Sequence, residues 1–149
     1  MTSVRGVLTA SVFAVLVTTQ AAQAGMDAKA VQVAAKAIGF VKPNGGGGDR
    51  IDVVGSAASL ADVQAALSSY KVAAGDGQGA FAAFVSSAAE AKIAGAKVLT
   101  IGPLACVEAA ACVLAVETSP KVTIYLSSAA AAAANLDFDP NFKLMVTTK

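Results

Sequence analysis

Short apolar runs alternate with helical patterns after residue 50, and this alternation most constrains the fold of the chain. Residues 51–55 (IDVVG) form a β-branched run closed by glycine, which is typical of a buried strand. Ser59 can then cap a helix, with Asp62 three residues later, and residues 70–73 (YKVA) read as the next strand. A strand, helix and strand in this order favour parallel pairing with a right-handed crossover. The sequence therefore predicts an α/β fold with an at least partly parallel sheet.

The pairing is expected to change near the C-terminal end. Residues 97–101 (KVLTI) predict a further strand, and residues 111–117 and 122–126 are two strand-like runs. Only four residues, including Pro120, connect those two runs, so they are expected to pair as an antiparallel hairpin. Helical patterns occupy residues 27–40, 88–93, 129–134 and 140–145. We expect a single three-layer α/β domain with a mixed, partly parallel sheet and a C-terminal antiparallel hairpin.

The N-terminal segment has the pattern of a secretory signal peptide. Arg5 is followed by an uncharged, mostly apolar run at residues 6–17, and Ala22-Gln23-Ala24 offers a small-x-small cleavage site. The apolar run is shorter than the about 20 residues that a membrane-spanning helix needs. We therefore predict a signal peptide at residues 1–24 and a domain at residues 25–149 that is exported into an oxidising compartment; the alternative is a retained N-terminal anchor.

Composition limits the chemistry that the chain can perform. The sequence contains no histidine, which removes Ser-His-Asp and Cys-His catalysis as well as His-ligated zinc and haem. Its 11 basic and 10 acidic residues are scattered and form no basic stripe, so no nucleic-acid partner is expected. No second long apolar run predicts membrane insertion after cleavage.

Two glycine-rich segments have some features of cofactor-binding loops. Residues 45–48 lack the Lys-Ser/Thr that ends a phosphate-binding loop, and residues 75–79 do not open a helix directly. Asp137 and Asp139 form the best acidic grouping, for a carboxylate enzyme or a Ca²⁺ site, but Asp139 before Pro140 is already explained as a helix cap. We expect no catalytic residue, no metal and no cofactor.

Cys106 and Cys112 are the two cysteines of the chain, and an even pair in an oxidising compartment predicts a disulfide. A disulfide requires Cα atoms within about 7 Å, so residues 107–111 must turn back despite their helix-favouring composition. A redox-active pair is the alternative, although the spacing is not Cys-x-x-Cys. Whether the bridge is structural or a switch stays open.

Phe40 and Val41 are the candidate partner patch, because they end the first predicted helix beside a glycine-rich joint. The alternative is that both belong to the core.

The order of several segments resembles the YfiR-like family of bacterial periplasmic proteins. The segments that carry the resemblance are residues 38–43 (IGFVKP), 51–55, 98–101 (VLTI), the cysteine pair, 122–126 (VTIYL) and 129–139. The chain departs from the family where Lys42-Pro43 replaces a usual Trp-Pro. The resemblance implies a non-catalytic periplasmic regulator that restrains a membrane-bound diguanylate cyclase by protein–protein contact. The alternative is a small-ligand-binding or scaffold domain of the same fold, and a homodimer is left open.

Overall fold

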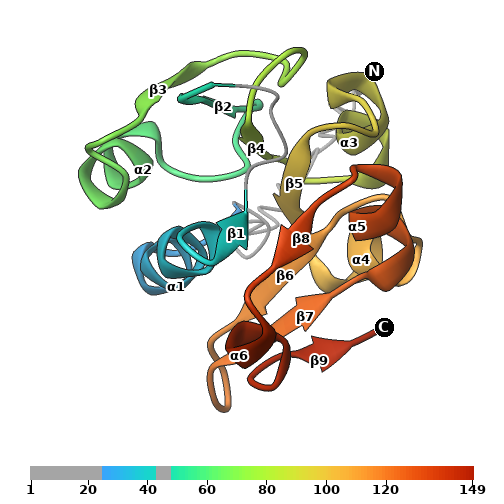
Figure 1. The fold of residues 1–149 in the computed structure, drawn as a ribbon. Coiled ribbons are helices and arrows are strands. Elements are labelled where there is room, and N and C mark those ends of the chain that lie inside the picture. Colours follow the sequence, from blue (N-terminus) through green and yellow to red (C-terminus); the bar gives the residue numbers. More distant parts are fainter. Residues whose placement is uncertain (1–24, 43–47) are drawn as a thin grey trace, which may run out of the picture.

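A mixed sheet of seven strands organises the residues that the computed structural model describes, 25–42 and 48–149 (Figure 1). The predicted signal peptide at residues 1–24 and most of the glycine-rich joint lie outside the described residues. The strands run in the order β3 (Lys71–Ala74), β2 (Arg50–Val53), β4 (Ala82–Phe84), β5 (Leu99–Gly102), β6 (Leu114–Glu117), β7 (Thr123–Leu126) and β9 (Thr147–Thr148).

The strand directions confirm the predicted mixed sheet. β3, β2, β4, β5 and β6 are parallel to their neighbours, whereas β6 and β7 pair antiparallel as a hairpin. β9, which the sequence did not predict, then pairs parallel with β7 at the sheet edge. The short strands β1 (Val41–Lys42) and β8 (Asp137–Phe138) form a separate antiparallel pair.

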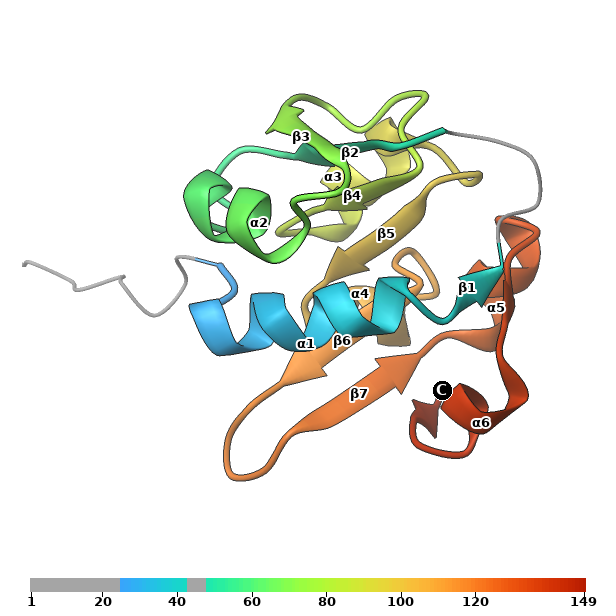
Figure 2. The same cartoon turned by 60° about the vertical axis from the view of Figure 1, so that its left-hand side comes forward.

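Helices cover both faces of the sheet, which gives three layers (Figure 2). On one face, α1 (Ala28–Ile38) and α2 (Leu60–Ala66) share a buried cluster with inward side chains such as Ile51, Phe84 and Leu114. On the other face, α3 (Ala88–Ala94) and α4 (Leu104–Glu108) pack with Val85 and Ala115 in a second cluster. α5 (Ser128–Ala133) follows β7, and α6 (Pro140–Lys143) lies between β8 and β9. The predicted single α/β domain is thus confirmed.

Most helix starts follow from capping residues in the sequence. The hydroxyls of Ser59, Ser87 and Ser127 accept backbone N–H groups at the starts of α2, α3 and α5. Asp27 and Asp139 do the same for α1 and α6. These side chains satisfy N–H groups that have no partner inside the helix, and they therefore fix where each helix begins.

A buried carboxylate fixes the loop that carries the chain from β3 to β4. Asp52 on β2 is 2% exposed and forms a bidentate pair with Arg50, at 2.7 and 3.0 Å. It also accepts the Gly77 N–H at 2.9 Å, while Arg50 donates to the Gln78 carbonyl at 2.8 Å. A side chain at Gly75 would come within 2.5 Å of the carboxylate. The predicted glycine loop therefore wraps a carboxylate of its own protein.

Stability is expected to depend on the ionisation of Asp52. The hydrogen bond from Arg50, together with the Gly77 N–H and the positive charge of Arg50, outweighs the opposing effect of burial and holds the pKa of Asp52 below its usual value. Because the pKa is lower in the folded protein, this stabilisation is present above the unfolded pKa of about 4 and is lost as the pH falls through the folded pKa.

Asp52→Asn is therefore expected to lower the free energy of unfolding at about pH 7 by roughly 1.5–3 kcal/mol and to flatten its acid dependence. Urea unfolding at about pH 7 and about pH 3 measures both effects. Asp49→Asn is the matched control, because Asp49 is exposed and lies 3.9 Å from the exposed Lys71. Equal loss of stability in the two variants would contradict the role of Asp52.

Candidate functional site

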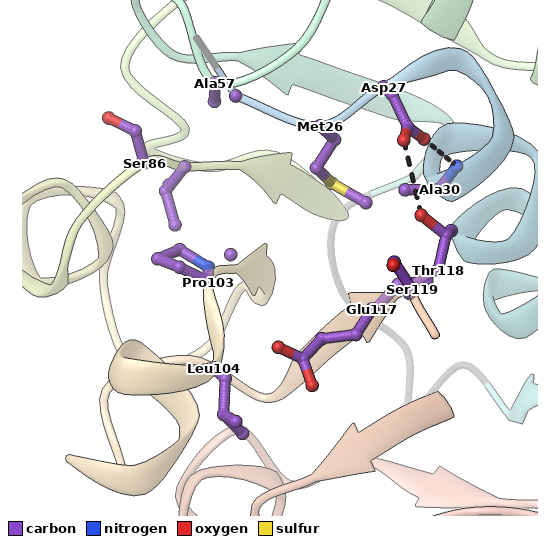
Figure 3. Close-up of a pocket in the computed structure, with 14 residues that line it drawn as sticks. Met26, Asp27, Ala30, Ala57, Ser86, Pro103, Leu104, Glu117, Thr118 and Ser119 are labelled. Atoms are coloured by element: carbon purple, nitrogen blue, oxygen red, sulfur yellow. Dashed lines mark hydrogen bonds between the residues drawn. The ribbon is translucent and has the colours of Figure 1, made fainter. Parts of the chain in front are cut away.

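A pocket of about 530 Å³ opens at the carboxyl edge of the parallel strands (Figure 3). Ser86 follows β4, Pro103 follows β5 and Glu117 ends β6, and all three line the pocket. The start of α1 and the loop after β2, through Ala57, complete the lining. In an open α/β sheet, ligands bind at the carboxyl ends of the strands.

The start of α1 is clamped against the loop after β2. The Met26 N–H donates to the Ala57 carbonyl at 2.8 Å, and Met26 forms a parallel bridge with Ala58. Gly25 has a φ of +100°, and a side chain there would collide with the carbonyl oxygens of Ser56 and Ala57. Only glycine fits this approach of two backbones, so Gly25 fixes one rim of the pocket.

Asp27 joins α1 to the turn between β6 and β7. One carboxylate oxygen accepts the Ala30 N–H at 2.7 Å, and the other accepts the Thr118 hydroxyl at 3.3 Å (Figure 3). Both contacts bring the negative charge to the pocket, which Asp27, Ala30 and Thr118 all line. The helix cap is thus also a wall of the site.

Glu117 supplies a second carboxylate, which Figure 3 shows extending towards the side of the pocket that Leu104 lines. Glu117 pairs with Thr123 across the hairpin, two positions along from the pair of Ala115 and Tyr125, so the side chains of Glu117 and Tyr125 lie on the same face of the sheet. The hydrogen bond to Glu117, then burial and the negative charges of Glu117 and Glu108, raise the pKa of Tyr125.

The predicted disulfide between Cys106 and Cys112 is confirmed, and it lies next to the pocket-lining residue Gly102. Their Cα atoms are 5.1 Å apart. Gly102, which lines the pocket, packs so closely that a Cβ there would lie 2.7 Å from the Cys112 sulfur. The bridge therefore holds the segment that follows β5 and leads into α4.

The chain turns back inside the disulfide loop as predicted. α4 was not predicted; it ends at Glu108, and Ala110 adopts the left-handed φ of 58° that reverses the chain. The N–H groups of Ala111 and Cys112 both donate to the Cys106 carbonyl, at 3.0 and 3.1 Å. The alanine-rich composition thus forms a short helix and a tight turn rather than a continuous helix.

The two residues of the candidate partner patch differ in exposure. Phe40 is 37% exposed and stacks on Phe142, with ring centroids 5.2 Å apart. Val41 is only 7% exposed, because it pairs with Phe138 in the β1–β8 ribbon and joins the core. Val41 is therefore corrected from surface to core, whereas Phe40 keeps an accessible face.

The acidic grouping near the C-terminus has structural partners. Asp139 accepts the Asn141 N–H at 2.8 Å as the cap of α6, and Asp137 lies 3.3 Å from the Lys143 ammonium. Neither residue lines the pocket. Within residues 25–42 and 48–149, no group of three or more His, Cys, Asp or Glu side chains could hold a metal ion.

The pocket residues were not among those predicted from the sequence. A usable signal was present, because Ser86, Gly102 and Glu117 each stand at the end of an apolar strand-like run, and parallel strands end at one edge. The contribution of Met26 and Asp27 has no local signal, since it depends on where α1 packs.

Comparison with known proteins does not identify the chain. No protein-family model matches it, and no curated protein matches it significantly. The resemblance to the YfiR-like family therefore stays a prediction. No helix in the described part of the chain is long and apolar enough to cross a membrane, and the disulfide is compatible with an exported protein.

The position of Glu117 can be tested through Tyr125. Glu117→Gln is expected to lower the pKa of Tyr125, because it removes the charge that stabilises the protonated phenol. Ultraviolet titration of phenolate in a Tyr70→Phe background reports Tyr125 alone, since the chain has two tyrosines. Glu108→Gln should shift the titration less, because the charge of Glu108 is the weakest of the causes. An unchanged titration in Glu117→Gln would place the carboxylate elsewhere.

Proposed function

We propose that this protein is an exported, non-catalytic binding protein that holds a small organic ligand in the pocket at the carboxyl edge of its sheet. The observation that carries the proposal is the position of the pocket. From β2 the chain continues to β3 on one side, whereas the strands from β4 to β6 extend the sheet on the other side. The loops after β2 and β4 therefore diverge, and both line the pocket.

The size and lining of the pocket suit a small molecule. Its volume of about 530 Å³ falls within the roughly 300–1,000 Å³ of ligand pockets in general. Met26, Leu104 and Val116 supply apolar surface, while the hydroxyls of Thr118 and Ser119 supply polar contacts. Such a mixture of apolar walls and few polar groups is usual where a ligand is bound and oriented.

Binding is favoured over catalysis by the environment of Ser86, a hydroxyl of the pocket that lies beside a carboxylate. Its hydroxyl and its N–H both donate to Glu90, at 2.7 Å each. Glu90 in turn donates its N–H to the Ser87 hydroxyl, which caps α3. The carboxylate is thus engaged in helix capping, and the chain has no imidazole to act as a base.

The proposal predicts that small fragments bind at this edge of the sheet. In an NMR screen with cationic, neutral and anionic fragments, the binders should shift the amides of residues 25–30, 102–104 and 116–119. Leu104→Trp should weaken their binding about tenfold or more, because the larger ring fills a lining position. Ile93→Trp, at an exposed position of α3 outside the pocket, is the control. If no fragment shifts these amides, the proposed function is wrong.

A second candidate function is regulation through a protein partner, and one surface favours it. Leu144 and Met145 are 85% and 61% exposed, two and three residues after the Phe142 on which the half-buried Phe40 stacks. Two neighbouring, largely exposed apolar side chains favour contact with another protein. The resemblance given above would make this partner a membrane-bound diguanylate cyclase.

A double substitution tests this second candidate. Leu144→Ser with Met145→Ser should leave the folded domain intact, because both side chains are largely exposed, and should release the cyclase. Cellular cyclic-di-GMP should then rise to the level of a strain that lacks the protein. Ile93→Ser and Val122→Ser replace exposed apolar residues elsewhere and should leave it unchanged. Cyclic-di-GMP that does not respond to removal of the protein would exclude this candidate.

A further inference from the structure

We propose that the pocket selects an organic cation, an aliphatic ammonium compound, and this inference rests on the proposed ligand-binding function. The charged side chains of the lining are all acidic. Among the described lining residues, the ionisable side chains are Asp27 and Glu117, and no lysine or arginine is present. A bound cation would offset this negative charge, whereas an anion would add to it.

The two carboxylates come from separate parts of the chain and line one pocket. Asp27 begins α1, and Glu117 ends β6. The residue after Glu117 is Thr118, whose hydroxyl is bonded to Asp27 at 3.3 Å. Figure 3 shows the Glu117 carboxylate extending towards Leu104, away from Asp27, so the two charges lie on different sides of one pocket and an ammonium group can donate to either of them.

The hydrogen-bonding groups around the carboxylates also suit a donor. The hydroxyl of Ser119 and the second lone pair of the Thr118 hydroxyl can accept from an ammonium group. The Glu117 carboxylate, which also lines the pocket, has about four lone-pair sites that can accept.

The apolar lining indicates an organic body rather than a bare metal ion. Met26, Val85, Leu104 and Val116 surround much of the pocket. Calcium takes about six to eight oxygen ligands, which two carboxylates on an apolar wall do not provide. An aliphatic chain, in contrast, gains from burial against these side chains.

The predicted cleavage of the signal peptide does not reverse the sign of the net charge of the pocket lining. Cleavage after Ala24 would place the α-ammonium of Gly25 at the rim of the pocket. One positive charge against the two carboxylates still leaves a net negative charge. Preference for an anion is the competing outcome of the test.

Three probes of equal length isolate the effect of charge: hexylammonium, hexan-1-ol and hexanoate. The native, oxidised protein is titrated with each by NMR, and amide shifts at residues 25–30, 102–104 and 116–119 locate the binding. Hexylammonium should bind at least about tenfold more tightly than the other two, and the difference should shrink at high salt.

Two isosteric variants assign the selectivity to the carboxylates. Asp27→Asn keeps a good helix cap, and Glu117→Gln keeps the side-chain shape, so both remove charge with little change in fold. Each should weaken hexylammonium about fivefold and leave hexan-1-ol unchanged. Glu108→Gln is the control, because Glu108 is acidic and exposed but does not line the pocket.

The outcomes separate this inference from the function on which it rests. Hexanoate or hexan-1-ol binding at these amides as tightly as hexylammonium overturns the cation inference and leaves the ligand pocket standing. Hexylammonium that binds equally well to the Asp27→Asn, Glu117→Gln double variant also overturns it. Failure of every probe and every screened fragment to shift these amides overturns both.

Discussion

Parallel pairing of β2, β4, β5 and β6 is the constraint on which the rest of the structure depends. Each of these strands must leave the sheet at the same edge, so the residues that follow them are brought together although they lie far apart in sequence. Because the chain extends the sheet in opposite directions from β2 and β4, the loops at that edge separate. The pocket is the space that this separation leaves, and the start of α1 forms one side of it.

The disulfide acts on the same edge of the sheet, where it restrains the short helix α4. α4 has five residues, too few to be stable by itself, and its cap residue Pro103 makes no side-chain hydrogen bond. In the chain-entropy model, a loop as short as that between Cys106 and Cys112 contributes about 2–2.5 kcal/mol. That amount is a useful share of the about 5–15 kcal/mol that keeps a domain folded. The close contact of Gly102 with the Cys112 sulfur passes this restraint directly to the pocket.

The sequence predicted those parts of the fold that depend on local pattern. Runs such as residues 51–55 became strands, and caps such as Ser59 began helices, because β-branched residues and side-chain hydroxyls act on their immediate neighbours. The antiparallel pair of β1 and β8 was not predicted, because each strand has only two residues and the two strands lie near opposite ends of the sequence. Val41 was misplaced for the same reason, since it is buried in the β1–β8 pair opposite Phe138. The pocket is encoded only in part, because the strand-like runs mark Ser86 and Glu117 at one edge but no local pattern places the start of α1 beside them.

Gly25 connects the predicted processing of the chain with the proposed site. The signal-peptide pattern requires small residues at positions 22 and 24, and it makes no demand on the residue that follows the cut. The structure makes that demand, because the backbone carbonyls of Ser56 and Ala57 leave no room for a side chain at position 25. The predicted cleavage site and the packing requirement thus fall on neighbouring positions, 24 and 25. A glycine at this position lets the domain begin at the rim of its own pocket, where a cut after Ala24 would leave a free ammonium group beside Asp27.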